Sequence, residues 1–342
     1  MARKIILFGE LLLRLAPRGF GRFLQADEFE VRYTGAEVNA GVSLANFGME
    51  AYAVSRVPDN DIGQACLNYL NRFRVNTDHV SRGGERLGLF YLETGAAQRP
   101  SRIIYDRLHS AIRDCGPLDF DWERICEGKD WLHFSGTAPA LGDRVVHALR
   151  EGLTVAKRHG LKVSCDLNYR AKLWSPEDAN RIMTSLMPSV DVLIGNEEDA
   201  EKVFGIRATG ADVEQGRLDG ASYQKVAEQL VRRFGVSMVA TTLRESSSAS
   251  ANGWSGLLYD GTRHYLSRRY EISPIVDRVG AGDSFTGALI YALLSGFDRQ
   301  EAVEFAAAAS CLKHSVAGDF NLASVAEVRA LMGGHSSGRV QR

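Results

Sequence analysis

The sequence lacks an excess of charge of either sign. Its 342 residues include 41 Lys and Arg and 42 Asp and Glu, so the formal net charge is −1 at pH 7. A chain without a basic excess exerts no broad attraction on nucleic acid or on anionic membranes. We therefore expect neither as a partner, and an anionic ligand has to be held by local arginines and by helix ends.

Two further features are missing, a disulfide or zinc framework and a membrane-spanning run. The five cysteines are odd in number and scattered, without a CxxC pair, which is typical of reduced thiols. The first apolar run, Lys4 to Phe8, ends at Gly9-Glu10 and is too short for a signal peptide or a membrane span. It fits a buried first strand, and a cytoplasmic location is the expectation.

Strand and helix patterns alternate regularly from residue 130 onward. The apolar run Val192-Leu193-Ile194, for example, precedes a helical pattern at Glu197 to Phe204. This alternation predicts an α/β fold, a doubly wound and mostly parallel sheet with helices on both faces. Ligands of such sheets bind beyond the carboxyl ends of the strands. That rule predicts one rim formed by Gly9-Glu10, Asp166 to Arg170, Asn196 to Asp199 and Thr242 to Arg244.

Two segments outside this alternation predict a small β-sheet lid. Residues 11–33 contain short apolar pieces and turns, and residues 87–110 carry a hairpin pattern. We expect them to form an antiparallel sheet within a single α/β domain of residues 1–335. Residues 336–342 are polar and predict a frayed tail. An exposed lid edge also favours a homo-oligomer, either a dimer through the lid or a larger assembly.

A glycine loop at Asp277 to Phe285 opens a helix. Apolar residues recur behind it at helical spacing, so Gly280-Ala281-Gly282 should lie at the helix N-terminus, where free N–H groups suit a phosphate. A carboxylate repels an anion, so Asp283 needs another role, and accepting a proton from an attacking hydroxyl is one. An ordinary glycine turn with an aspartate in the first helical turn explains this stretch equally well.

The groups at the predicted rim fit phosphoryl transfer. A helix N-terminus and a metal stabilise the charge on the transferred group, while a carboxylate activates the attacking hydroxyl. The glycine loop, the acidic cluster at Asn196 to Asp199 and the arginines supply these parts. Hydride transfer explains them less well, because the GxGxxG fingerprint is absent after the first strand.

The chain resembles the ribokinase-like, or PfkB, family of carbohydrate kinases over nearly its whole length. Asp277 to Asp283 is similar to the family's carboxy-terminal signature, and Gly35 to Gly48 to its amino-terminal one. Asn196 to Asp199 resembles its Asn-x-x-Glu element, with Asp199 in place of the usual Glu, and Thr34 stands where many relatives have a glycine. The resemblance implies ATP and Mg²⁺ as cofactors and leaves a monovalent cation such as K⁺ open.

The resemblance also implies roles for individual residues. Asp283 is the implied base, and Gly280, Ala281 and Gly282 form the implied anion-binding loop of the catalytic site. A metal would be held through water by Asn196 and Asp199. The implied nucleotide residues are Asn168, Thr242, Arg244, Gly280 and Gly282. The implied substrate pocket consists of Gly35, Ala36, Glu37, Asn39, Tyr91, Tyr105, Arg107, Arg170 and Asp319.

Ordinary structural roles compete with several of these assignments. Tyr91 and Tyr105 fit aromatic strand positions, and Arg107 fits a surface arginine. Asn39 fits a helix cap as well as a substrate contact. For Arg244, a surface role and a ligand role are balanced.

Within the family, the pattern is most similar to the sugar-acid kinases that phosphorylate 2-keto-3-deoxygluconate to 2-keto-3-deoxy-6-phosphogluconate. The residues that carry this similarity are Gly9-Glu10, Tyr105 to Arg107, Asp166 to Arg170, Thr242 to Ser246, Lys313-His314 and Gly318 to Asn321. A guanidinium such as that of Arg107 or Arg170 matches a substrate carboxylate with two parallel hydrogen bonds. The alternatives are a fructokinase or another sugar kinase of the family, and a sugar-binding regulator without catalysis.

Overall fold

The computed structural model describes residues 2–196, 198–208 and 220–334. The expected tail at 336–342 and Glu197 of the acidic cluster lie outside these residues. In the described part, strands β1, β4, β5 and β8 to β14 form one large sheet in the order β13-β12-β11-β10-β9-β8-β1-β4-β5, with β14 paired to β12. Their bounds are β1 (Lys4–Phe8), β4 (Glu50–Val57), β5 (Val75–Arg82), β8 (Trp131–Ser135), β9 (Lys162–Asp166), β10 (Val192–Asn196), β11 (Met238–Ser248), β12 (Ala251–Tyr259), β13 (His264–Leu266) and β14 (Tyr270–Ile272).

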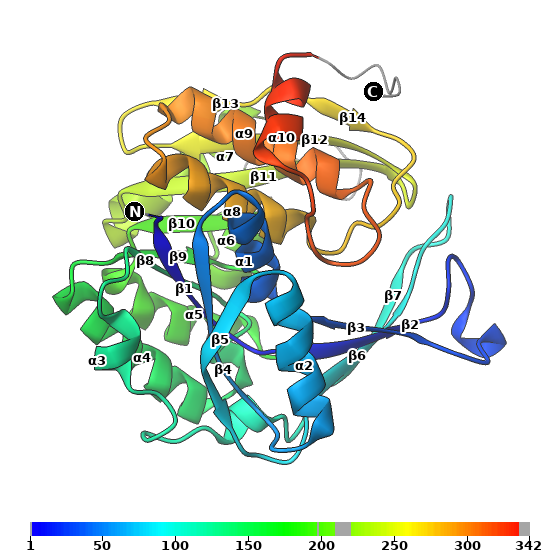
Figure 1. Cartoon of the computed structure of the whole chain (residues 1–342). Helices are drawn as coiled ribbons and strands as arrows, with labels where there is room; N and C mark the ends of the chain where they lie inside the picture. The colour runs from blue at the N-terminus through cyan, green and yellow to red at the C-terminus, as the bar shows by residue number, and fades with distance from the viewer. Residues whose placement is uncertain (1, 197, 209–219, 335–342) are drawn as a thin grey trace.

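Helices cover both faces of this sheet (Figure 1). Alternate residues of the central strand β1 pack into different cores, Ile6 and Phe8 into one and Ile5 and Leu7 into the other. Five helices contribute to the first core: α3 (Trp122–Cys126), α4 (Asp143–Arg158), α5 (Pro176–Leu186), α6 (Asp199–Phe204) and α7 (Gly220–Phe234). The second core is formed with α1 (Ala36–Asn46), α2 (Asp61–Arg72), α8 (Ala281–Leu294), α9 (Arg299–Lys313) and α10 (Val325–Met332).

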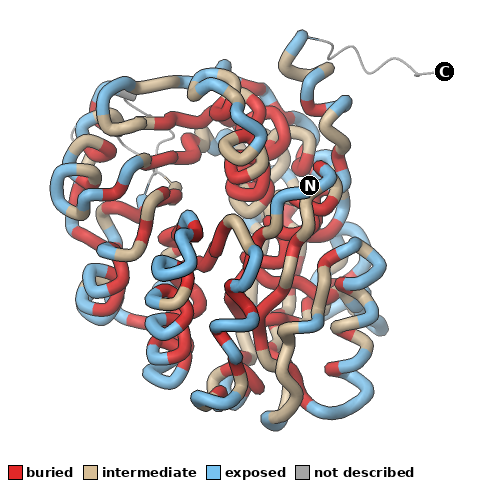
Figure 2. Tube along the Cα trace, turned by 60° about the vertical axis from the view of Figure 1, so that its left-hand side comes forward, coloured by how far each residue is buried: buried red, intermediate tan, exposed pale blue. Residues whose placement is uncertain are grey.

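This two-sided burial explains the continuous apolar runs of the central strands. A parallel strand with helices on both faces has no solvent face, so it carries no alternation of polar residues. The tube in Figure 2 is coloured red for buried residues along these strands and on the helix faces that meet them. The α/β prediction, with a mostly parallel sheet covered on both faces, is confirmed.

A separate four-stranded sheet projects from the body as the predicted small sheet (Figure 1). Its order is β3-β2-β6-β7, with β2 (Leu12–Ala16), β3 (Glu30–Thr34), β6 (Gly88–Glu93) and β7 (Arg102–Asp106). The expectation of a purely antiparallel sheet is wrong, because β2 and β6 pair in parallel. Strand β2 begins a few residues after β1, and β6 begins a few residues after β5. Because β1 and β5 run in the same direction in the large sheet, β2 and β6 leave that sheet in the same direction.

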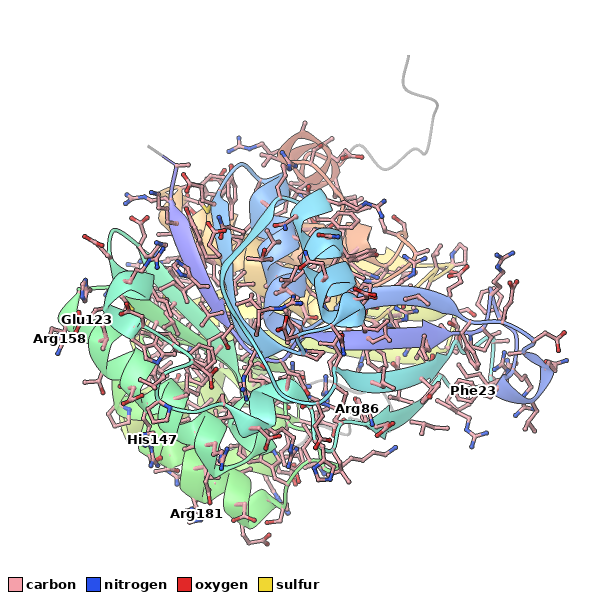
Figure 3. All side chains as sticks on the ribbon, turned by 60° about the horizontal axis from the view of Figure 1, so that its bottom comes forward. Phe23, Arg86, Glu123, His147, Arg158 and Arg181 are labelled. Carbon is pink, nitrogen blue, oxygen red and sulfur yellow. The ribbon has the colours of Figure 1, made fainter. Side chains whose placement is uncertain are left out.

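The base and the outer end of the lid are each fixed by a side chain (Figure 3). Near the body, the Arg86 guanidinium donates to both carboxylate oxygens of Asp106, at 2.9 and 2.8 Å. At the outer end, the Phe23 amide donates to Glu93 Oε2 at 2.9 Å. A bidentate arginine and carboxylate pair is geometrically specific. Arg86 therefore joins the start of β6 to the end of β7 where the lid meets the body.

Candidate active site

The carboxyl ends of the central strands and the lid enclose a cavity of about 510 Å³. Segments that follow β1 and β9, the end of β10 and the part of β11 beside it reach the cavity, as expected for ligand sites of parallel sheets. Most residues of the sequence-based prediction meet here. Those that line the cavity are Gly35, Ala36, Asn39, Tyr105, Arg107, Asn168, Arg170, Asn196, Asp199, Thr242, Arg244, Gly280, Ala281, Gly282, Asp283 and Asp319.

Helix α8 points its N-terminus at this cavity. Gly280 is the N-cap residue with φ of 83°, a conformation that suits glycine. A Cβ atom at Gly280 would overlap the backbone oxygen of Asp319, whereas one at Gly282 would meet nothing within 4 Å. The loop is therefore packed tightly on its rear side and open on the cavity side. The Ala281 amide donates to the Arg278 carbonyl oxygen at 3.3 Å, and the other N–H groups at this helix N-terminus suit an anion.

Asp283 lies in the first turn of α8 and lines the cavity. Its Oδ2 accepts a hydrogen bond of 2.7 Å from Asn39 Nδ2. The pKa of Asp283 is raised to about 7, chiefly by burial; the hydrogen bond from Asn39 and the charge of Arg170 act to lower it, and the charges of Glu37 and Asp319 act to raise it. A carboxylate that titrates near neutral pH is suited to accept a proton from a hydroxyl group.

Asn39 is held in place by a second hydrogen bond. Its Oδ1 accepts a hydrogen bond of 2.7 Å from the hydroxyl of Thr34, the last residue of lid strand β3. Thr34 therefore fixes the Asn39 amide with its NH₂ group towards Asp283. Thr34, which departs from the family pattern, thus contacts Asn39, and Asn39 in turn contacts the candidate base Asp283.

Two predicted pocket residues do not line the cavity. Glu37 points into the core, where its Oε1 accepts hydrogen bonds from the Ser135 amide at 2.9 Å and hydroxyl at 2.6 Å, and burial raises its pKa to about 7. Tyr91 lies in β6 beside Phe90, which lines the cavity. Successive strand residues point to opposite faces, and Tyr91 packs on Phe29 on the outer face of the lid.

Arg107 reaches the cavity as a buried ion pair. Its Nε donates to Glu10 Oε2 at 2.7 Å, and its guanidinium makes a second contact with the same oxygen. The other oxygen, Glu10 Oε1, is buried and has no hydrogen-bond partner within the described chain. Because Glu10 also lines the cavity, this free acceptor is suited to a ligand hydroxyl. The prediction placed Glu10 at the rim and among the residues that carry the family similarity, but not in the substrate pocket.

Three acidic side chains gather on the opposite wall. The pKa of Asp166 is raised to about 7 by burial and by the nearby charges of Asp199 and Asp283. Burial also raises the pKa of Asp199, whose two oxygens accept from the Tyr169 amide at 3.1 Å and the Asn196 amide at 2.9 Å. The charge of Arg170, a cavity-lining residue whose guanidinium donates to the Tyr169 carbonyl oxygen at 3.2 Å, lowers all three pKa values. These side chains form an acidic wall of the cavity, but the described residues contain no group of three or more His, Cys, Asp or Glu side chains placed to hold a metal ion directly.

Asp319 and lid strand β2 meet behind the glycine loop. Arg14 of β2 donates to Asp319 Oδ1 and, at 2.8 Å, to Asp277 Oδ2. Asp319 Oδ2 remains without a partner in the described residues, although it is buried at the cavity wall. Arg14 therefore links the lid, the start of the glycine loop and a candidate substrate residue in one buried network.

Sequence reasoning assigned no site role to several residues that line the cavity. Leu12, Phe90 and Ile103 form a lid wall, and Asn252, Trp254, Arg278 and His314 lie towards the other end with Thr242 and Arg244. The strand periodicity of β2, β6 and β7 could have shown which residues share a lid face, but not which face meets the cavity. The residues on β12 come from a strand that folds back against β11, and no local pattern predicts that contact.

Comparisons with known proteins show what the whole chain is similar to. The crystal structure of 2-dehydro-3-deoxygluconokinase from Thermotoga maritima is similar, with 49% identity and a TM-score of 0.93 over 97% of this chain and 100% of that chain. The 2-dehydro-3-deoxygalactonokinase of Haloferax volcanii is 31% identical over 338 residues, 99% of both chains. The 2-dehydro-3-deoxygluconokinase of Thermoproteus tenax is 28% identical over 320 residues, 92% of this chain and 89% of that protein.

Residues 2–323 match the family described as pfkB family carbohydrate kinase. The chain belongs to this family, and it is a phosphotransferase with an alcohol group as acceptor. The prediction of family and enzyme class is confirmed. The relatives differ in the sugar acid that their names state, so they leave the choice between gluconate and galactonate forms to the site itself.

Proposed function

We propose that this member of the pfkB family phosphorylates 2-keto-3-deoxygluconate, also called 2-dehydro-3-deoxygluconate, to 2-keto-3-deoxy-6-phosphogluconate. The phosphoryl donor is ATP with Mg²⁺. The observation that carries the proposal is the presence of Arg107 and Arg170 in the same cavity as Asp283 and the α8 N-terminus. A guanidinium pairs with the carboxylate of a sugar acid, which orients a hydroxyl at the far end of the substrate towards the base.

In the proposed reaction, an Asp283 carboxylate oxygen accepts the proton of the substrate hydroxyl. The hydroxyl oxygen then forms a bond to the γ-phosphorus, while the bond from that phosphorus to the bridging oxygen of ADP breaks. The N–H groups at Gly280 to Gly282 stabilise the negative charge on the transferred group. The lid wall of Leu12, Phe90 and Ile103 excludes water, which would otherwise compete as the acceptor.

In this proposal, a magnesium ion lies beside the acidic wall and is held largely through water, because the described residues offer no group of three or more His, Cys, Asp or Glu side chains that could ligate it directly. When bound, it neutralises charge on the phosphates. Asp199 Oδ1 and Oδ2 are already hydrogen-bonded to backbone amides, which supports an indirect role through a water molecule for Asp199 and Asn196. Asp166, whose pKa is raised by burial and by its acidic neighbours, is a further ligand in this proposal, because a cation would offset their repulsion.

The experiment that tests the substrate is a coupled ADP-release assay with a panel of compounds. The panel contains 2-keto-3-deoxygluconate, 2-keto-3-deoxygalactonate, gluconate, fructose and ribose. We expect kcat/KM for 2-keto-3-deoxygluconate to exceed that for fructose by about 100-fold or more, because a neutral sugar leaves the arginines unpaired. The phosphorylated position follows from phosphorus–proton coupling in the product spectrum. Equal activity on fructose contradicts the proposal.

One observation favours a neutral sugar as the second candidate. Glu10 already pairs with Arg107 and compensates its charge, and the free oxygens of Glu10 and Asp319 suit hydroxyl groups. The same panel separates this candidate, since a fructokinase prefers fructose to the acids. A protein that releases no ADP with any compound of the panel, yet binds one of them in calorimetry, is the sugar-binding regulator without catalysis.

The outer face of the lid supports the proposal of a homodimer. Phe29, Val31 and Ile104 are exposed there by 38, 54 and 50%, beside Tyr91. Apolar residues exposed together on a sheet face are typical of an interface. Sedimentation velocity tests it, and a Val31→Glu variant that stays as associated as wild type contradicts a dimer through the lid. No helix of the described residues is apolar over a length that would cross a bilayer, and the proposed location is the cytoplasm.

A further inference from the structure

Lys313, the last residue of α9, carries a buried ammonium group that the proposed reaction does not use. The residue is 0% exposed. Its Nζ donates to the backbone carbonyl oxygens of Asp277 at 3.0 Å and of Val316 at 3.2 Å. Asp277 begins the glycine loop, and Val316 lies in the segment that continues to Asp319. The ammonium therefore connects the two backbone segments that pack against each other behind the α8 N-terminus.

The charge of Lys313 is compensated by its neighbours. Burial lowers its pKa to about 8, whereas Asp277 and Asp319 act in the opposite direction. Arg14 bonds to both of these aspartates, so two cations face two anions in the buried network. A buried ammonium without such partners would lose its proton instead. Here the aspartates act against that loss, and Nζ donates both of its hydrogen bonds to backbone carbonyl oxygens.

Two backbone carbonyl oxygens behind the glycine loop converge on one positively charged group. The carbonyl oxygens of Asp277, at the start of the glycine loop, and of Val316 both accept hydrogen bonds from the Lys313 ammonium. Gly280 contacts the backbone of Asp319 so closely that no Cβ fits between them. Converging backbone carbonyls are the usual ligands of a monovalent cation in proteins. A lysine ammonium carries the same single positive charge as such a cation and donates hydrogen bonds to carbonyl oxygens.

We propose that the Lys313 ammonium is a built-in cation that holds the glycine loop in its phosphate-binding conformation, so that the enzyme needs no free monovalent cation there. This inference rests on the nucleotide role proposed above for the loop. Lys313 is a positioning residue, because its contacts are to the loop backbone. The K⁺ that the family resemblance left open is thereby replaced by a side chain.

The first test uses the wild-type enzyme. Steady-state kinetics are measured at one ionic strength in potassium, sodium, ammonium and tetramethylammonium chloride. We expect kcat and the KM for ATP to change by less than about twofold, since the carbonyl site already holds a charge. Activation of about tenfold or more by K⁺ over tetramethylammonium overturns the proposal, because it requires a free cation.

The second test removes the ammonium. Lys313→Met keeps the length of the stem, and Lys313→Ala leaves space for a small cation. In tetramethylammonium, we expect ADP affinity by calorimetry and kcat to fall by about tenfold or more in both variants. Ammonium or methylammonium should restore Lys313→Ala by about fivefold or more but leave Lys313→Met unchanged, because the stem fills its site. Lys225→Met, at an exposed position of α7, is the control and should match wild type.

The outcomes separate loop positioning from mere stability. A folded Lys313→Ala that is impaired but responds to neither ammonium nor methylammonium overturns the proposal, as does a Lys313→Met with wild-type ADP affinity. If thermal melting shows that neither variant folds, the cation series on wild type decides. ADP affinity needs no sugar acid, so a wrong substrate leaves this test intact, and a failure here leaves wild-type activity on 2-keto-3-deoxygluconate unaffected.

Discussion

The Asn39 amide donates to Asp283 Oδ2 at 2.7 Å and thereby joins the first turns of α1 and α8 across the cavity. The bond lowers the pKa of Asp283, although burial has the larger effect and raises it to about 7. The same bond keeps one carboxylate oxygen occupied. The other oxygen, Asp283 Oδ1, is then the one that faces a substrate hydroxyl in the proposed reaction.

Replacing Asp283 by Asn should lower kcat by about two orders of magnitude or more, because the amide cannot accept the hydroxyl proton. ADP affinity, measured by calorimetry, should stay within about threefold of wild type, since the α8 amides remain. The control is Asp61→Asn, which changes an exposed aspartate in the first turn of another helix. Near-normal turnover of Asp283→Asn would exclude this residue as the base.

Removing the hydroxyl of Thr34 should affect the base through Asn39. In Thr34→Val, Asn39 Oδ1 no longer accepts a hydrogen bond from a hydroxyl group at position 34. The Asn39 amide is then no longer fixed with its NH₂ group towards Asp283. We expect kcat to fall by about tenfold with little change in the KM for ATP, the size of one lost buried hydrogen bond. Thr34→Ser keeps the hydroxyl and should behave as wild type. Equal kinetics of the Val and Ser variants would show that the contact has no catalytic effect.

The rate should depend on pH through Asp283. Its pKa of about 7 means that the carboxylate is protonated below neutral pH and cannot accept a proton. The kcat/KM for the sugar acid should therefore rise about tenfold from about pH 6 to about pH 8. The profile is measured with saturating coupling enzymes at each pH. A profile that is flat across this range contradicts the raised pKa.

The same raised pKa has a consequence for stability. An aspartate whose pKa is higher in the folded than in the unfolded state contributes stability below its unfolded pKa, and this contribution is lost as the pH rises to about 7. Asp283→Asn should therefore raise the melting temperature of the ligand-free protein at about pH 8 by about 2–5 °C. The gain should shrink towards about pH 4. A variant that melts below wild type at about pH 8 contradicts this sign.

Substrate selection should depend on Arg170. Arg170→Ala should raise the KM for 2-keto-3-deoxygluconate by about tenfold or more, since a charge-assisted pair is lost, while ADP affinity is unchanged. Arg181→Ala, at an exposed position (Figure 3), is the control. Arg107→Ala should show the same effect, with a lower melting temperature because Glu10 loses its buried partner. Unchanged kinetics of both variants would remove the sugar-acid assignment.

Local patterns were sufficient for much of the fold. The apolar runs predicted parallel strands, because a strand that is buried on both faces has no polar alternation. The helical spacing of apolar residues behind the glycine loop predicted the start of α8. Thr34 was noticed as a departure from the family pattern. Its hydroxyl contact with Asn39 could not be predicted, because it depends on how β3 enters α1.

The direction of individual side chains came only from the tertiary structure. The sequence by itself determined an α/β fold with Asp283 at a helix N-terminus, since helix and strand periodicity are local properties. Its assignment as a kinase came from the resemblance to the pfkB family. It did not determine that Tyr91 and Glu37 turn away from the cavity, or that Arg14 and Lys313 meet Asp277 behind the loop. These contacts join residues far apart in the chain, and they form because buried charges and polar groups need partners wherever the packed fold supplies them.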